Sequence, residues 1–97
     1  MRKKAKKAPK KRGEKWFVYI LNCCDHSLYT GITKDVQRRF KTHSEGKGAR
    51  YTRTRLPLKL VYQESCKTRV EALVRECAVK AFPRAKKLAL VKQFKPA

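Results

Sequence analysis

The 97-residue chain contains no apolar run that approaches the roughly 20 residues needed to span a bilayer as a helix. Its basic N-terminus is not followed by an apolar segment, so it does not resemble a signal peptide either. No internal repeat is visible. These absences predict one small soluble domain in the cytoplasm, without a membrane partner.

Cysteines are few, and their spacing excludes the commonest metal site. Cys23 and Cys24 are adjacent, and Cys66 and Cys77 are isolated, so the chain has no Cys-x-x-Cys pair. A structural zinc site is therefore disfavoured. We expect all four to be reduced thiols, as is usual in the cytoplasm.

Acidic residues are scarce. The chain has 27 Lys and Arg residues against 7 Asp and Glu residues, which gives a net charge of +20. Residues 1–13 form a basic, low-complexity tail that is expected to be disordered when free, and the predicted domain covers residues 14–97. A field of this sign favours a polyanionic partner. The tail is interpreted as a phosphate-binding arm, with a merely solubilising role as the alternative.

The acidic residues are also scattered. None of them forms a two-carboxylate cluster in the sequence, which argues against an enzyme with two metal ions. Glu71 already has a structural role, because Thr68-Arg69-Val70-Glu71 is a capping box at the start of a helix. Glu76 follows in the same helix and is the best candidate for a functional carboxylate. The competing interpretation is a surface ion pair with Lys80, four residues later.

Hydrophobic patterning predicts three strands and three helices. The strands are expected over residues 16–23, 28–32 and 58–64. In the first strand, apolar residues stand at both odd and even positions, which point to opposite faces, so both faces should be covered. The helices are expected over about 34–45, with Thr33 as N-cap, from 68 to Pro83, and over about 84–94. The second helix should pack through an apolar stripe, which comprises Val70, Leu73, Val74, Cys77 and Ala81.

Five residues have the chemistry that phosphodiester hydrolysis requires. Tyr19 and Tyr29 lie ten residues apart on the first two strands, and Arg39 and His43 follow on the first helix. Tyrosine hydroxyls can orient water and transfer protons, and a guanidinium matches two phosphate oxygens. A single carboxylate such as Glu76 can hold a Mg²⁺ ion, which keeps most of its waters.

This order of residues resembles the GIY-YIG nuclease superfamily, above all its small stand-alone members (the UPF0213 type). The resemblance rests on the triplets Phe17-Val18-Tyr19 and Tyr29-Thr30-Gly31, followed by Arg39, His43 and Glu76. It departs from the family pattern at Phe17, Val18 and Thr30, but both tyrosines are retained. With the patterning above, it implies an α+β fold: a small three-stranded antiparallel sheet flanked by three or so helices.

The resemblance also implies roles for these residues. Tyr19 and Tyr29 would line one active site, with Tyr19 or a neighbouring basic group activating water. Arg39 would bind the scissile phosphate, His43 would be a supporting base, and Glu76 would ligate a single Mg²⁺ or Mn²⁺. Gly31 is the glycine of the second triplet. Further cations are expected to contact nucleic acid: Lys47, Arg50, Arg53, Arg55 and Lys80.

The expected function is therefore metal-dependent hydrolysis of DNA, in repair or in processing of structured DNA, with RNA as another substrate. A non-catalytic nucleic-acid-binding module with the same fold is the first alternative, and a ribosome-associated basic protein is the second. The individual residues also have ordinary structural interpretations. Tyr19 and Tyr29 could be core aromatics, and His43 could stabilise the end of its helix.

Overall fold

The computed structural model describes residues 15–94, so the basic tail predicted over residues 1–13 lies outside the described residues. The described part is an α+β fold, as predicted, with a three-stranded antiparallel sheet in the order β3-β2-β4 and four helices. The elements are β2 (Trp16–Asn22), β3 (Leu28–Thr33), α2 (Val36–Ser44), α3 (Arg50–Arg53), β4 (Lys59–Cys66), α4 (Arg69–Ala81) and α5 (Arg84–Gln93). None of these helices could cross a membrane.

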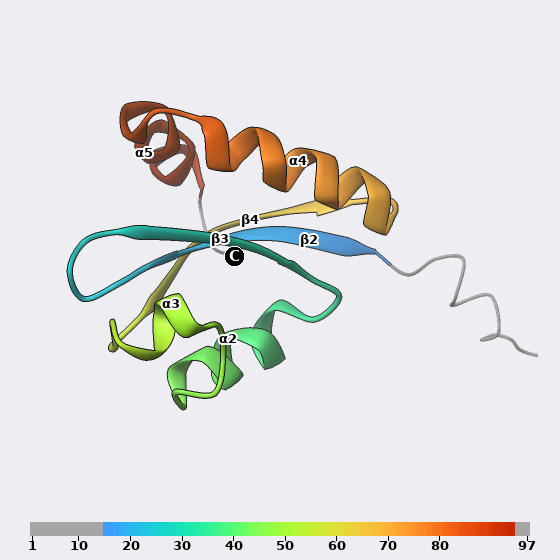
Figure 1. Ribbon diagram of the computed structural model, residues 1–97. Helices are drawn as coiled ribbons and strands as arrows, with labels where there is room; N and C mark the ends of the chain where they lie inside the picture. The colour runs from blue at the N-terminus through green and yellow to red at the C-terminus, as the bar shows by residue number, and fades with distance from the viewer. Residues whose placement is uncertain (1–14, 95–97) are drawn as a thin grey trace, which may run out of the picture.

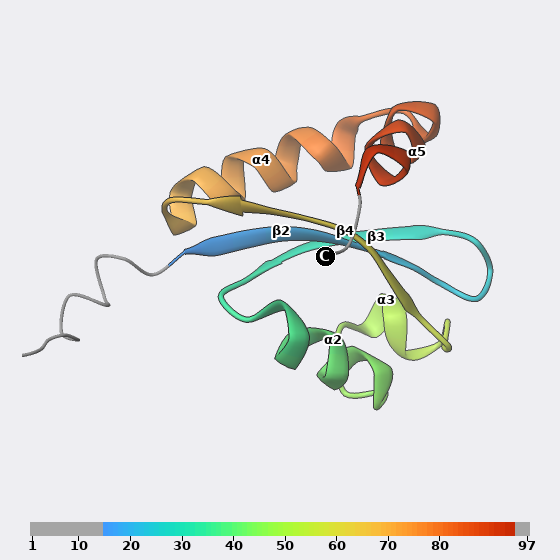
Figure 2. The ribbon, with the colours of Figure 1, turned by 180° about the vertical axis from the view of Figure 1, so that it is seen from behind.

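The sheet has helices on both faces. α2 and α3 lie on one face, and α4 runs along the other with α5 at its end (Figures 1 and 2). The central strand β2 is covered on both sides. Tyr19 and Leu21 belong to a core cluster with Val36 of α2, while Val18 and Ile20, of the opposite parity, are fully buried as well. This confirms the expectation drawn from the apolar residues in both parities.

Local hydrogen bonds determine where α2 begins. Its N-cap is Asp35, whose Oδ1 accepts from the backbone N–H of Arg38 at 3.1 Å, rather than the predicted Thr33. Thr33 lies two residues earlier, where its hydroxyl oxygen accepts from the backbone N–H of Asp35 at 3.1 Å. A carboxylate is the stronger acceptor for the exposed N–H groups of the first turn, which explains the shift.

The helix α3 was not predicted from the sequence. It comprises only four residues, Arg50–Arg53, within a segment for which the sequence predicted neither a helix nor a strand. A single helical turn leaves almost no periodicity to detect, and an arginine-rich sequence gives no apolar stripe.

The predicted packing face of α4 was wrong. The helix begins as predicted, because the Thr68 hydroxyl accepts from the Glu71 N–H at 3.1 Å. Its buried residues, however, are Ala72 and Val79, and the supposed stripe faces outward, with Val70 68% and Val74 66% exposed.

An ion pair accompanies this orientation. Arg75 lies on the sheet side of α4, where its Nε is 3.0 Å from Glu64 Oε2 on β4. The small side chain of Ala72 lets the helix approach the sheet closely. Cys77, expected to act as a buried hydrophobe, is exposed together with Leu73 and Ala81.

Candidate active site

The side chain of Tyr19 lies over the neighbouring edge strand, β3. It is buried on β2, and its register partner on β3 is Gly31. A Cβ atom at position 31 would lie 2.6 Å from the Tyr19 hydroxyl oxygen and 2.8 Å from the ring carbon that bears it. Gly31 is therefore required because the aromatic ring occupies the space that any side chain there would need.

A chain of hydrogen bonds fixes the protonation of His43. Tyr19 Oη is 2.9 Å from His43 Nε2, and His43 Nδ1 is 2.8 Å from Thr52 Oγ1. The Thr52 hydroxyl donates its own proton to the carbonyl oxygen of Ala49 at 3.0 Å. Thr52 must then accept from Nδ1–H, which leaves Nε2 as an acceptor. Tyr19 therefore donates to His43, and its oxygen keeps free lone pairs.

Both members of this pair are neutral near pH 7. Burial raises the pKa of Tyr19 to about 12, although the positively charged Arg39 acts in the opposite direction. Burial lowers the pKa of His43 to about 4, and the positive charge of Arg39 contributes in the same direction. The pair is a neutral hydroxyl–imidazole couple, which suits proton relay.

Arg39 and Glu76 both act electrostatically on the Tyr19 hydroxyl. Arg39 belongs to α2, and its positive charge lowers the pKa of Tyr19. Glu76 belongs to α4, on the opposite face of the sheet, yet its negative charge contributes to the raised pKa of Tyr19. The charges of Arg39 and Glu76 therefore both act on the Tyr19 hydroxyl, although the two residues belong to helices on different faces of the sheet.

The Glu76 carboxylate has a second interaction. Its side chain is only 18% exposed, and its Oε2 is 3.1 Å from Lys80 Nζ, the ion pair that the sequence offered as the competing interpretation. Within residues 15–94, no group of three or more His, Cys, Asp and Glu side chains could hold a metal ion. A single carboxylate fits a hard divalent cation that keeps most of its waters.

Tyr29 lies in contact with two other rings, one of which stacks on it. Its ring centre is 5.4 Å from that of His43 and 6.0 Å from that of Tyr51, with an angle of 22° between the two tyrosine planes. The guanidinium carbon of Arg55 lies 3.8 Å from the centre of the Tyr51 ring. The structure thus brings Tyr29 beside Tyr19 and His43, and Tyr29 also stacks on the exposed ring of Tyr51.

The other predicted nucleic-acid contacts do not all lie together. Lys47, Arg50 and Arg53 are exposed on and before α3, on the same face of the sheet as α2. Arg55 is held by Asp25 at 3.0 Å in addition to its contact with Tyr51. Lys80 is paired with Glu76 on the other face, so it does not join the α3 group.

Sequence reasoning missed two residues that hold His43 in place. Thr52 is fully buried in α3, and no periodic signal marks it in an arginine-rich segment. A Cβ atom at Gly48 would lie 2.2 Å from His43 Nδ1, so the backbone approaches the imidazole too closely for any other residue. Nothing in the sequence around Gly48 marks a contact with a side chain five residues earlier.

The buried imidazole predicts a pH-dependent stability. The folded pKa of His43, about 4, lies below the ordinary value of 6.5, so its stabilising contribution is present above pH 6.5 and lost as the pH falls towards 4. At ~1.4 kcal/mol per pKa unit, the loss between pH 7 and pH 4 should be about 3 kcal/mol. Urea denaturation of the wild type and of His43→Gln across this range provides the measurement. The difference between the two curves should shrink as the pH falls, and parallel curves would contradict the assignment.

Comparisons with known proteins identify the family of this chain. Residues 15–88 match the model of the GIY-YIG catalytic domain. A "UPF0213 protein" of Staphylococcus aureus is 53% identical over 77 residues, which cover 79% of this chain and 94% of the relative.

Two solved structures are similar as well. The solution NMR structure of the UPF0213 protein BH0048 from Bacillus halodurans is 49% identical, with a TM-score of 0.53, and the match covers 80% of this chain and 83% of that one. The NMR structure of EF2693 from E. faecalis is 36% identical, with a TM-score of 0.56 and coverages of 82% and 85%. The family match spans both triplets, Arg39, His43 and Glu76, and the chain therefore belongs to the GIY-YIG nuclease domain family, among its small UPF0213-type members.

Proposed function

We propose that this chain is a DNA endonuclease that hydrolyses phosphodiester bonds with the help of one divalent metal ion. The observation that carries the proposal is the Tyr19–His43 hydrogen bond of 2.9 Å, on which the charges of both Arg39 and Glu76 act. A hydroxyl and an imidazole are thus in contact, and the charges of a guanidinium and a carboxylate both act on that hydroxyl, which supports the proposal.

The hydrogen-bond directions define a route for the proton of the attacking water. Tyr19 Oη accepts this proton while its own proton passes to His43 Nε2. The Nδ1–H bond to Thr52 stays in place and holds the imidazole in orientation. A bound phosphate beside the pair adds negative charge, which raises the pKa of His43 and makes it a better base than in the free protein.

Arg39 supplies the phosphate contact. Its charge acts on the Tyr19 hydroxyl, so a phosphate bound by this guanidinium would be near the activated water. The planar fork can bind two phosphate oxygens and stabilise the charge that develops on them.

Glu76 is the residue that would hold the metal ion. Nucleases of this family generally use divalent ions, and Mg²⁺ or Mn²⁺ suits a site with one carboxylate. The ion supplies Lewis-acid stabilisation of phosphate and leaving-group oxygens. Glu76 contributes the negative charge that attracts the ion, and Lys80 stabilises that carboxylate in the free protein.

DNA is the proposed substrate because of the charge distribution. The exposed cations Lys47, Arg50 and Arg53 lie on the face that carries α2, and the whole chain has a net charge of +20. Such a protein binds the phosphate backbone without reading base sequence, and its affinity falls steeply with salt. We place it in the cytoplasm, in DNA repair or the processing of structured DNA, with RNA as the second substrate.

One contact favours the alternative of a binding module without turnover. The carboxylate of Glu76 is paired with Lys80 at 3.1 Å, and this pairing can replace a metal ion in a protein that only binds nucleic acid. The departures at Phe17, Val18 and Thr30 are compatible with either function.

The two functions are separated by an assay of the purified wild type. Labelled single-stranded, duplex and branched DNA are incubated with Mg²⁺, with Mn²⁺ and with EDTA. We expect cleavage of at least one substrate that depends on the metal. Salt-sensitive binding without any product would instead support the binding module.

A further inference from the structure

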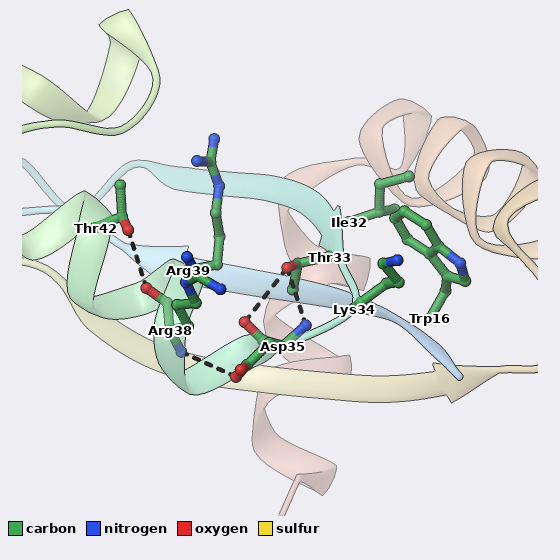
Figure 3. A pocket seen from close by; sticks show the side chains of 8 residues that line it. All are labelled: Trp16, Ile32, Thr33, Lys34, Asp35, Arg38, Arg39 and Thr42. Carbon is green, nitrogen blue, oxygen red and sulfur yellow. Dashed lines mark hydrogen bonds between the residues drawn. The ribbon is translucent and has the colours of Figure 1, made fainter. Parts of the chain in front are cut away.

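A cavity of about 430 Å³ lies where β3 passes into α2. Arg38 and Arg39 lie at one end of it and Trp16 at the other, with Thr33 and Lys34 between them (Figure 3). Its volume is in the range of small-ligand sites. Arg39, which the proposed function assigns to the scissile phosphate, is one of the residues that line the cavity.

Trp16 combines an aromatic surface with nearby positive charge. It is the only tryptophan of the chain and is half-buried at the start of β2. Lys34 Nζ lies 5.7 Å from the centre of its ring, and the guanidinium carbon of Arg69 lies 5.6 Å from it. These three residues come from β2, from the segment after β3 and from α4, so the fold gathers them from distant parts of the sequence.

The charge of the cavity is positive. The cavity is lined by three cations, Lys34, Arg38 and Arg39, and by one acid, Asp35. The Oδ1 of Asp35 already accepts a hydrogen bond from the backbone N–H of Arg38, as the N-cap of α2. An indole ring beside several cations is the combination that binds a nucleotide, because bases stack on aromatic rings while cations bind the phosphates. An aliphatic or anionic small molecule without a ring would leave the indole unused.

We propose that this cavity binds the nucleotide next to the scissile phosphate, with an unpaired base against the indole of Trp16 and its phosphate near Lys34 and Arg38. The proposal rests on the proposed function for the placement of the scissile phosphate at Arg39. Trp16 would be a binding residue that determines which nucleotide conformation reaches the active site.

The test uses the fluorescence of Trp16, which reports on this position alone because the chain has no other tryptophan. A short oligothymidylate is titrated into the wild type in EDTA, so that binding is measured without cleavage. An abasic oligonucleotide of the same length is the matched control, because it has the same phosphates and no bases. We expect saturable quenching by the oligothymidylate, with little or none from the abasic chain.

Variants extend the test. In anisotropy measurements with a labelled oligothymidylate, Trp16→Ala should weaken binding about tenfold or more, while Trp16→Phe keeps most of the affinity. The abasic chain should bind both variants equally, and circular dichroism checks that they fold. If Trp16→Ala fails to fold, the wild-type fluorescence still decides.

Two outcomes would overturn the proposal. Equal quenching by the abasic chain would mean that the cavity takes only phosphate, and binding without any change at Trp16 would place the nucleotide elsewhere. Neither would affect the proposed cleavage, which is measured separately with metal present. Conversely, base-dependent quenching in a protein that cuts no DNA would uphold the cavity and refute the nuclease.

Discussion

Tyr19→Phe is expected to reduce the rate of metal-dependent DNA cleavage by about 10²–10⁴-fold, the usual contribution of a positioned proton-transfer group. The substitution removes the hydroxyl that lies 2.9 Å from His43 Nε2 and on which the charge of Arg39 acts. The ring, which fills the space over Gly31, is retained. Binding of DNA should change little, so the loss should appear in kcat rather than in KM.

Tyr62→Phe is the matched control for this substitution. Tyr62 lies on β4, and its hydroxyl donates to Glu64 on the α4 side of the sheet, away from His43. Single-turnover rates of both variants are compared after thermal melts confirm folding, because loss of the Tyr19 hydroxyl leaves a buried acceptor on His43 that costs ~1–3 kcal/mol. Equal, small losses in the two variants would show that Tyr19 is only a core aromatic.

Glu76→Gln is expected to lower cleavage by roughly 10³-fold, because a bound metal ion supplies several kcal/mol of transition-state stabilisation. The amide has nearly the same shape as the carboxylate but no negative charge to attract a divalent ion. The loss of cleavage should be smaller at a high concentration of Mn²⁺, because more of the ion then occupies the weakened site. Binding of DNA in EDTA should be preserved or slightly tighter, because the variant is more positive.

Glu71→Gln tests whether any glutamate of α4 would give the same result. Glu71 lies five residues earlier on the same helix, and its Oε1 accepts the backbone N–H of Lys67 at 2.9 Å. Glutamine can make the same capping contact, so this variant should fold and cleave like the wild type. A Glu76→Gln protein as active as Glu71→Gln, with contaminating nucleases excluded, would remove Glu76 from the mechanism.

The sheet could be predicted from the sequence because its signals are local. The strand around Tyr19 has apolar residues in both parities, and Asp25 and Ser27 mark the turn that follows, where Ser27 N–H donates to Asp25 Oδ1 at 3.0 Å. The orientation of α4 could not be predicted in this way. Its apolar residues form a regular stripe, but the sheet contacts the side with Ala72 and Val79 and pairs Glu64 with Arg75.

The same distinction between local signals and contacts across the fold applies to the candidate site. Residue types and order identified Tyr19, Tyr29, Arg39, His43 and Glu76, whose placement in one working site remains a prediction. Thr52 and Gly48 escaped notice because their importance depends on a contact with His43 across the fold, at 2.8 Å for Thr52. The sequence predicts Trp16 only as the first residue of a strand, because its proximity to Lys34 and Arg69 depends on how distant segments pack together.

The central claim is that Glu76, from one face of the sheet, and Tyr19 and Arg39, from the other, act on one metal-bound phosphate. The most direct measurement is the paramagnetic broadening of backbone amide NMR signals by Mn²⁺, in the wild type and in Glu76→Gln. We predict that broadening in the wild type centres on Glu76 and includes Gly31 and Arg39, and that it disappears in the variant. Broadening centred elsewhere, or unchanged in Glu76→Gln, would contradict the claim.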